Sequence, residues 1–265
     1  MQVKRGSQYV IPNSGVSGFS LIELAIAIFV ITLLLGGLLV PLSTQVEQRK
    51  FSETQKVLDE IKEALMGYTL ANGYLPCPDK TTAAGVGTAN DGQEDVNAGT
   101  CVALEGNLPW VTLGVIGYDS WGNRFRYRVD AQFSQRVPTF TIATASTTNR
   151  VCTTAACTSL LTTISDGPPA VVLSHGKNGY GAINSLTSSA NPDPQPPPPS
   201  IPPRPDELKN TGNADFVLGT VSANATFVSH PASAAGSVAG EFDDIVVWLS
   251  REVLLNRMVA AGRLP

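Results

Sequence analysis

One carboxylate, Glu23, lies within a run of the sequence that is otherwise free of charged side chains. The run covers residues 19–40, which is 22 residues, and a membrane-spanning helix needs about 20 apolar residues. We therefore expect a span over residues 19–41. A carboxylate inside a spanning helix costs roughly 2.5–3.5 kcal/mol to insert and usually has a partner. The chemistry that Glu23 predicts is ion pairing with a cation rather than catalysis.

A basic leader precedes this run, and its only charges are Lys4 and Arg5. An ordinary secretory signal has its small-residue cleavage site after the apolar run, and no such site follows here. The small residue stands before the run instead, as Gly18 followed by Phe19. This arrangement indicates a leader of residues 1–18.

The stretch GFSLIE at residues 18–23 resembles the processing site of type IV prepilins and of type II secretion prepseudopilins. The resemblance implies that a prepilin peptidase cuts between Gly18 and Phe19 and methylates the new amino terminus. It also implies that Glu23 pairs with the Phe19 ammonium of a neighbouring subunit during assembly. A cation and a carboxylate attract strongly in a low-dielectric setting, and each is costly to leave alone. The alternative is a plain signal anchor with an isolated Glu23.

Catalytic chemistry has few candidates in this sequence. Its two histidines are His175 and His230, and both fit structural or surface positions better than general acid–base roles. Ser174 and His175 are neighbours, so on a strand their side chains point to opposite faces and cannot form a triad. Neither a Gly-x-Ser-x-Gly motif nor a phosphate-binding glycine loop occurs. We therefore expect no catalytic residues and no enzymatic activity.

The four cysteines lie on the far side of the apolar run, which fits an oxidising periplasm and up to two disulfides. Proximity along the chain favours Cys77–Cys101 with Cys152–Cys157 among the three pairings that four cysteines permit. A zinc site is the competing interpretation. No C-x-x-C occurs, and the two histidines lie far away in sequence, so disulfides are favoured.

Two further segments resemble the same family. Residues 119–127 are similar to the D-P-W-G-N-x-Y/F-x-Y segment of major type II secretion pseudopilins, and residues 174–181 to their S-x-G-x-D-G-x-x-G loop. In that family the loop helps to bind calcium, and the resemblance implies a calcium site at Ser174, Asn178 and Asp243. Asn178 stands where the family has Asp, which removes a charge and weakens such a site. The alternative is a Gly-Asn hairpin without metal.

A second calcium hypothesis concerns Asp91, Glu94 and Asp95, within the loop-like residues 78–107. Their spacing differs from that of an EF-hand loop, which places oxygen ligands at alternate positions and ends in a distal Glu. We therefore expect these three carboxylates to lie in a solvated loop.

The elements that position these groups begin with a long helix, predicted over residues 20–71. Its second half carries an apolar stripe that we expect to face the domain core, made of Phe51, Leu58, Ile61, Leu65 and Tyr68. Asn72-Gly73 is a C-terminal stop, and two prolines that follow prevent the helix from resuming. Pro41 should kink the helix, because its ring removes a backbone hydrogen bond and clashes with the preceding turn.

Strands are predicted after residue 107, at 108–114, 124–129, 139–145, 170–174, 214–218, 225–229 and 245–249. In the second of these, apolar residues alternate with Arg124, Arg126 and Arg128. This pattern predicts a half-buried strand with the arginines on a solvated face. A helix over 250–261 follows, and its apolar side carries Leu254, Leu255 and Met258.

Residues 191–205 are rich in proline and predict a stiff polyproline II segment, which we interpret as a surface excursion inside the domain. The net charge of −4, without a basic face, gives nucleic-acid binding no electrostatic support. With 43% hydrophobic and 15% charged residues, the chain can bury a core.

These observations predict an α+β fold, in which a long N-terminal helix with a membrane half and an amphipathic half packs on a small antiparallel sheet. Residues 1–18 would be the leader, 19–41 the membrane and assembly helix, and 42–265 a periplasmic globular domain. The resemblance implies a pilin-like fold and a structural subunit of a type IV pilus or a type II secretion pseudopilus. The length of 265 residues indicates a minor or tip subunit, because major pseudopilins are shorter.

The expected location is the bacterial inner membrane, crossed once with the C-terminal domain in the periplasm, and then the pilus or pseudopilus. The expected partners are the prepilin peptidase, other pilins or pseudopilins, the inner-membrane assembly platform and the lipid bilayer, without nucleic acid. Two alternatives stay open. One is a tip pilin whose loops bind a surface, a secreted substrate or DNA, and the other is a membrane-anchored periplasmic enzyme.

Overall fold

The computed structural model describes residues 18–82, 85–146, 148–162, 167–186, 205–211, 225–234, 237 and 240–264, with the side chains of 35–42 left out. The chain forms two compact units, Met1–Gln48 and Arg49–Pro265. The long helix α1 (Leu21–Asn72) has residues in both units. Its bounds agree with the helix predicted over residues 20–71.

The first unit presents an apolar surface over residues 19–34, where Phe19, Ile22 and Leu33 are each more than half exposed. No helix in the part of the chain with described side chains is both long and apolar enough to cross a membrane. The predicted kink at Pro41, like the last part of the predicted span, falls on residues 35–42 and therefore lies outside the described side chains.

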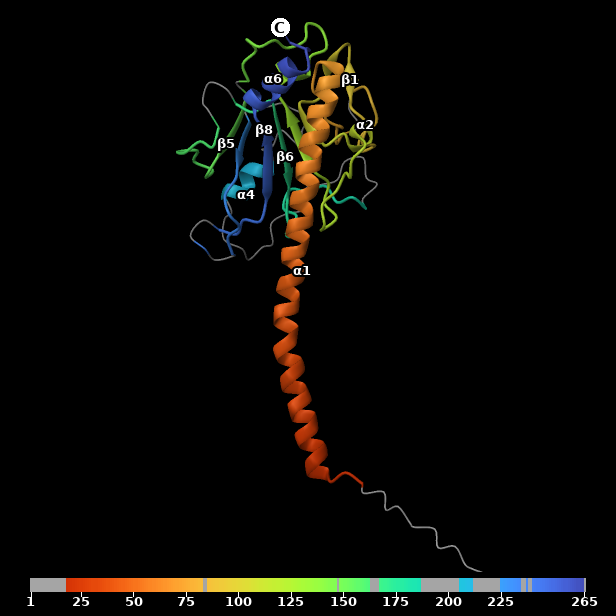
Figure 1. Ribbon diagram of the computed structural model, residues 1–265, viewed down its shortest axis with the longest axis vertical. Coiled ribbons are helices and arrows are strands. Elements are labelled where there is room, and N and C mark those ends of the chain that lie inside the picture. The colour runs from red at the N-terminus through yellow and green to blue at the C-terminus, as the bar shows by residue number, and fades with distance from the viewer. Residues whose placement is uncertain are drawn as a thin grey trace, which may run out of the picture. The chain divides into compact units, whose positions relative to one another are not determined.

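A four-stranded antiparallel sheet forms the centre of the second unit (Figure 1). Its strands, in spatial order, are β3 (Glu105–Asn107), β4 (Arg126–Val129), β6 (Ala170–Ser174) and β8 (Ile245–Leu249). In register, Tyr127 of β4 pairs with Val172 of β6, which pairs in turn with Val247 of β8. The hydrophobic segments at 170–174 and 245–249 thus form strands, as the sequence predicts, and the structure shows that the two strands are neighbours.

One face of this sheet packs on α1. Because side chains alternate between the two faces of a strand, Tyr127, Val172 and Val247 point to the same side and are buried there against Leu58 and Leu65 of α1. The C-terminal helix α6 (Arg251–Ala260) adds its predicted apolar side to this core. The predicted α+β architecture, a long N-terminal helix on an antiparallel sheet, is therefore confirmed.

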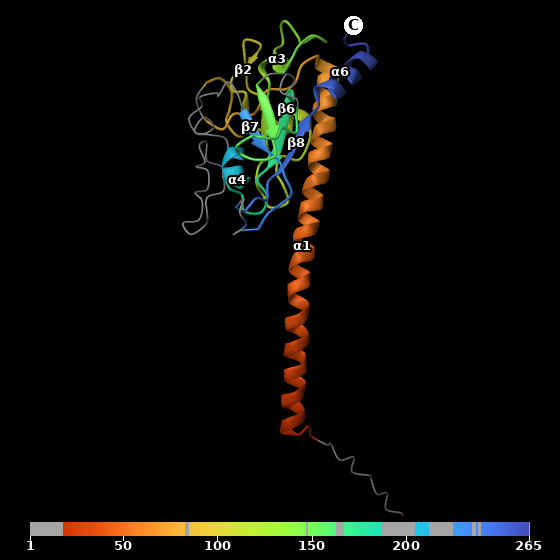
Figure 2. The same ribbon diagram turned by 90° about the vertical axis from the view of Figure 1, so that its left-hand side faces the viewer.

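A second layer covers the opposite face of the sheet. It contains the parallel strand pair β5 (Asn149–Cys152) and β7 (Ala225–Val228), and the short helix α4 (Pro205–Asn210) contacts β7. Val151 and Phe227 of this layer bury Val171, Leu173 and Val246 of the sheet. Figure 2 shows the sheet between α1 on one side and β7 with α4 on the other.

This second layer overturns the prediction that the arginines of β4 lie on a solvated face. Arg126 and Arg128 are only 3% and 2% exposed. Glu105 on the neighbouring strand β3 forms an ion pair with each guanidinium, and Asn149 in β5 accepts a hydrogen bond from Arg128 Nε at 2.8 Å. These partners are required, because removing a charge from water without compensation costs several kcal/mol. Arg124 is half-buried.

Of the remaining predicted elements, one strand and one helix are present in the structure and two strands are not. The strand over 225–229 and the helix over 250–261 are confirmed as β7 and α6. The strand expected at 108–114 is wrong, since α2 (Trp110–Leu113) forms there, and 139–145 contains no strand among its residues, all of which are described. The expected strand at 214–218 and residues 191–204 of the Pro-rich segment lie outside the described residues.

The apolar stripe of α1 is confirmed in its centre and differs at its ends. Leu58, Ile61 and Leu65 are buried in the core, as expected. Phe51 is 45% exposed, so its assignment to the core is wrong. Tyr68 is half-buried, and its hydroxyl donates a hydrogen bond to Glu94 at 2.9 Å. The buried positions of α1 therefore run from Thr54 to Thr69, and Phe51 lies outside them.

Two disulfides join the pairs that sequence proximity favours. Cys77 is bonded to Cys101 and Cys152 to Cys157, with Cα–Cα distances of 5.2 and 5.1 Å. The first bond ties the segment after α1 to the hairpin of β1 (Val96–Asn97) and β2 (Thr100–Cys101). The second closes a short loop at the end of β5. The competing zinc interpretation is excluded for these cysteines, because none carries a free thiol.

Candidate functional site

The predicted processing junction lies immediately before α1. Gly18, Phe19 and Ser20 precede the helix, and Glu23 stands in its first turn. Ser20 donates hydrogen bonds to Glu23 Oε2 from both its backbone N–H and its hydroxyl, each at 2.9 Å. The Glu23 N–H in turn donates to Ser20 Oγ at 3.3 Å. This reciprocal arrangement is a capping box, which satisfies N–H groups that have no partner within a helix.

The capping box holds the Glu23 carboxylate at the start of the helix, beside the junction. An anionic side chain is also favoured there by the partial positive charge of the helix N-terminus. The pattern S-x-x-E at residues 20–23 could have predicted this arrangement from the sequence. It places a carboxylate within one helical turn of Phe19, which is 88% exposed.

The carboxylates of the 78–107 segment do not form a solvated loop, which corrects the expectation for that segment. Asp95 is 2% exposed and accepts a hydrogen bond from the Lys80 N–H at 2.8 Å. Glu94 accepts hydrogen bonds from the Cys77 N–H and from Arg136 Nη2. Asp91 accepts one from the N–H of the neighbouring residue 93. Each carboxylate therefore serves a separate local contact, and the three do not converge on a metal site.

The other family-like segments, around residues 119–127 and 174–181, meet at one end of the sheet. Asp119 Oδ1 accepts a hydrogen bond from the Asn123 N–H at 2.9 Å, and Asp119 Oδ2 accepts one from Ser174 Oγ at 2.5 Å. Asn123 Nδ2 donates to the Gly176 carbonyl at 2.9 Å. The turn before β4 and the loop after β6 thus hold each other in place. The Ser174 hydroxyl therefore donates its hydrogen bond to Asp119 and not to the neighbouring His175.

Of the calcium ligands that the resemblance implies, Asn178 and Asp243 are in contact, since the Asn178 N–H lies 2.9 Å from Asp243 Oδ2, whereas Ser174 bonds elsewhere. The Ser174 hydroxyl is bonded to Asp119, as just described. Asn178 turns its amide N–H toward Glu207 Oε1, at 2.7 Å, and its amide oxygen accepts from the Tyr180 N–H at 2.9 Å. Asp243 alone keeps a carboxylate oxygen without a hydrogen-bond partner among the described residues. Calcium takes six to eight oxygen ligands, and these three side chains do not present such a set.

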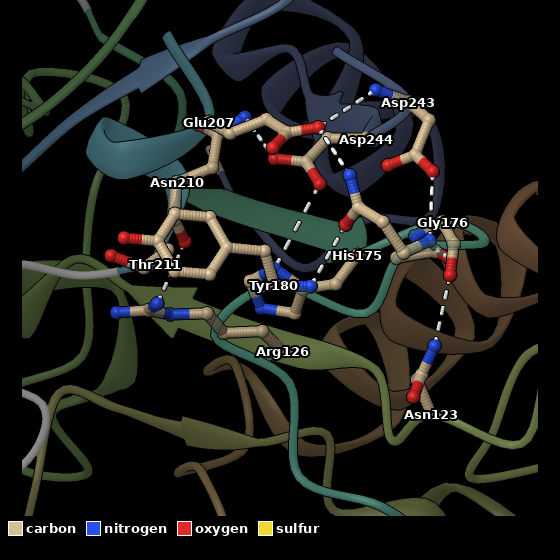
Figure 3. Close-up of polar contacts among 12 residues, drawn as sticks. Asn123, Arg126, His175, Gly176, Tyr180, Glu207, Asn210, Thr211, Asp243 and Asp244 are labelled. Carbon is tan, nitrogen blue, oxygen red and sulfur yellow. Dashed lines mark hydrogen bonds and ion pairs between the residues drawn. The ribbon is translucent and has the colours of Figure 1, made fainter. Parts of the chain in front are cut away.

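The structure instead gathers a different group of carboxylates, shown in Figure 3. Glu207 comes from α4, and Asp243 and Asp244 come from the residues just before β8. One oxygen from each lies within 4.8 Å of the others. We call these three residues the acidic cluster. His175 borders it, with its Nδ1 atom 3.8 Å from Asp244 Oδ1, outside hydrogen-bond distance.

One carboxylate oxygen of Asp243 and one of Asp244 already accept hydrogen bonds from the protein. Asp243 Oδ2 accepts a hydrogen bond from the Asn178 N–H at 2.9 Å. Asp244 Oδ2 accepts one from Asn210 Nδ2 at 2.8 Å. Three other buried atoms of this region have no hydrogen-bond partner within the described parts of the chain, namely Asp243 Oδ1, Asp244 Oδ1 and His175 Nδ1.

Burial governs the ionisation of these groups. It raises the pKa of Asp243 to about 7 and raises the pKa of Asp244 well above its usual range, with a further contribution from the neighbouring carboxylates. Burial, followed by the charge of Arg126, lowers the pKa of His175 to about 3, so its imidazole is neutral at pH 7. A cation placed among these groups would favour the ionised carboxylates and would be compatible with the neutral imidazole.

Gly176 permits the close approach of Asp243. Its φ of +60° lies in the left-handed region, and a Cβ atom there would lie 2.3 Å from the Asp243 carbonyl oxygen and 2.6 Å from Asp243 Oδ1. A side chain at this position would therefore push Asp243, just before β8, away from the loop after β6. The glycine is a structural requirement of the acidic cluster.

Sequence reasoning identified Asp243 and missed Glu207, and it assigned His175 a structural or surface position. A local signal for Glu207 exists, since Pro205, Asp206 and Glu207 match the preference for proline and acidic residues in the first turn of a helix. That signal predicts the start of α4 but not its contact with residues 243–244. Comparison with protein-family models, with curated proteins and with solved structures found no match.

Proposed function

We propose that this chain is a structural subunit of a type IV pilus or a type II secretion pseudopilus. In this proposal a prepilin peptidase cleaves between Gly18 and Phe19, and the chain is anchored once in the bacterial inner membrane with its second unit in the periplasm. Subunits then assemble through α1, with Glu23 facing the Phe19 ammonium of a neighbour. In the same proposal, the α+β fold of the chain is pilin-like.

The observation that carries the proposal is the position of the junction relative to the helix. Gly18 and Phe19 directly precede α1, and the one carboxylate of the apolar run lies in its first turn. Cleavage there would create an ammonium at Phe19, only four residues from Glu23. A full positive charge close to the carboxylate adds Coulomb attraction that the neutral Ser20 hydroxyl does not supply, and this attraction is strong in a low-dielectric setting. The ammonium of a neighbour could therefore replace the Ser20 hydroxyl as the partner of Glu23.

The exposed apolar side chains of residues 19–34 also support assembly. Large side chains such as Leu21 and Phe29, which are 87% and 68% exposed, have to be covered in the functional protein. Lipid could cover them before assembly, and neighbouring helices could cover them afterwards. The two disulfides of the second unit fit an oxidising compartment such as the periplasm.

The test follows processing and assembly separately. Gly18→Ala should abolish the loss of about 2 kDa that removal of an 18-residue leader produces, and Glu23→Ala should be processed normally but fail to crosslink to other pilins. Glu53→Ala, which removes an exposed carboxylate further along α1, is the matched control and should assemble. A wild-type chain that is never shortened, together with a silent Glu23→Ala, would show the run to be a plain anchor.

A position at the filament tip is the second candidate. The layer of β5, α4 and β7 covers the sheet face opposite α1 and enlarges the domain beyond one helix and one sheet. Deletion of residues 191–204, which keeps Pro205 as the first residue of α4, should then leave filaments intact while adhesion or secretion is lost. Loss of the filaments themselves would contradict a role confined to binding.

A further inference from the structure

Unsatisfied polar atoms around the acidic cluster call for a ligand. The Asp244 side chain is 0% exposed and that of His175 is 1% exposed, so water does not solvate either group. A buried polar atom without a hydrogen bond costs about 1–3 kcal/mol, and a buried charge costs more. Asp243 Oδ1, Asp244 Oδ1 and His175 Nδ1 all carry this cost in the structure as it stands. Each of the three atoms offers a lone pair, that of His175 Nδ1 when the imidazole proton is on Nε2, which points to a metal ion as the missing partner.

We propose that His175, Glu207, Asp243 and Asp244 form a site for one first-row divalent metal ion, best matched by Zn²⁺. The ligand atoms would be His175 Nδ1, Asp243 Oδ1, Asp244 Oδ1 and one carboxylate oxygen of Glu207. Four protein ligands of this kind match the number and the donor types of structural zinc sites, and His175 would approach from the side of Asp244, 3.8 Å from Asp244 Oδ1. The site is independent of the assembly function proposed above, because it uses no residue of α1.

The donor types distinguish this site from a calcium site. Calcium prefers six to eight oxygen ligands, whereas imidazole suits zinc and other first-row ions. Here three of the carboxylate oxygens already accept hydrogen bonds from the protein, namely Asp243 Oδ2, Asp244 Oδ2 and Glu207 Oε1, and one buried donor is a nitrogen. Too few oxygens remain for calcium, while the number and mixture of donors suit Zn²⁺.

Other residues fix the direction of the ligands. The Asn178 N–H holds Asp243 Oδ2 and Asn210 Nδ2 holds Asp244 Oδ2, so the other oxygen of each carboxylate is turned toward the cluster. Such outer contacts orient metal ligands and typically change affinity 10- to 100-fold when removed. Arg126 lies nearby in Figure 3, and its positive charge is balanced by the ion pair with Glu105.

The experiment uses the tag-free full-length chain, purified in detergent and stripped of metal with a chelator. After dialysis against equal concentrations of Zn²⁺ and Ca²⁺, elemental analysis should find one zinc per chain and no calcium. Zn²⁺ alone should raise the midpoint of thermal unfolding, because a ligand that binds only the folded state stabilises it. His175→Gln should weaken zinc binding at least ten-fold.

The second histidine provides the matched control. His230 is stacked on Phe242 and lies 3.3 Å from Asp206, so it belongs to the same region but its ring contacts other residues than the proposed ligands. His230→Gln should leave zinc binding unchanged. In NMR spectra of the wild-type chain, whose two imidazoles are separated by comparison with His230→Gln, Zn²⁺ should shift only the His175 signals.

Three results would overturn the proposal, and the first two depend on the wild-type chain alone. The first is binding of Ca²⁺ in preference to Zn²⁺ by the wild-type chain, which would indicate an all-oxygen site. The second is binding of neither ion, which would show that the cluster does not hold a metal. The third is an imidazole signal for His175 that does not move when zinc is bound.

Discussion

At the scale of single residues, Asp79 shows how one buried carboxylate organises the segment between the helix and the sheet. Its side chain is fully enclosed and accepts hydrogen bonds from the N–H groups of Asn90 and Gly92 and from Asn107 Nδ2. Burial raises the pKa of Asp79 to about 7, whereas these three donors favour its ionised form. The desolvation is the larger effect.

We expect this carboxyl to make the protein less stable as the pH rises from about 4 to 7. An acid whose pKa is higher in the folded than in the unfolded state binds a proton on folding between the two values, so the free energy of unfolding falls as pH increases there. Asp79→Asn should abolish the uptake of this proton on folding. The free energy of unfolding should then fall less steeply with pH, by at most about 1.4 kcal/mol per pH unit. Urea unfolding at several pH values measures it.

Asp59→Asn serves as the control, because Asp59 is an exposed carboxylate on α1. Its variant should retain the pH slope of the wild type. If Asp79→Asn also retained the full slope, the three N–H donors would outweigh desolvation, and Asp79 would be ionised throughout this pH range.

At the scale of elements, the packing of α1 on the sheet depends on its central turns. Leu58 is fully buried between the helix and the strands, whereas Phe51, two turns earlier, is 45% exposed. Leu58→Ala should therefore lower the free energy of unfolding by about 2–5 kcal/mol, because it leaves a cavity. Phe51→Ala should cost less than about 1 kcal/mol, since the ring fills no cavity. Equal losses in denaturant titrations would contradict this assignment of the core.

The same contrast explains which elements the sequence predicted. Strands β6 and β8 are continuous apolar segments, so their identity is visible locally, and α1 carries a clear helical period. Strand β5 is short and contains Asn149 and Arg150, and it was missed because its partner β7 begins 73 residues after Cys152. The segment 139–145 has a strand-like composition, but no strand of the described sheets pairs with it.

The candidate metal site was predictable only in part, for a related reason. Asp243 and the loop after β6 were identified from a local pattern. Glu207 reaches the same place from α4, on the far side of the Pro-rich segment, and no local pattern records that contact. His175 gave no sign of being a ligand in the sequence, because its free Nδ1 atom becomes apparent only when its buried surroundings are known.

At the scale of the second unit, the fold has three layers, and its central sheet is buried on both faces. The face toward α1 is apolar, while the other face combines apolar side chains with the charges of Arg126 and Arg128. These arginines connect the layers, because Arg126 donates to the Asn210 carbonyl of α4 and Arg128 to Asn149 of β5. The second layer is therefore attached by charged groups as well as by hydrophobic contacts.

Glu105 supports this attachment from within the sheet, since its carboxylate pairs with both arginines and is only 15% exposed. Glu105→Ala would leave two buried guanidinium groups without their carboxylate, and breaking a buried ion pair costs about 3–5 kcal/mol. Glu63→Ala is the control, because Glu63 pairs with Arg257 at a surface where both side chains are about half exposed or more. An exposed pair contributes at most about 1 kcal/mol. Urea unfolding of the two variants should therefore differ several-fold in the loss of stability, and similar losses would show that hydrophobic contacts alone hold the second layer on the sheet.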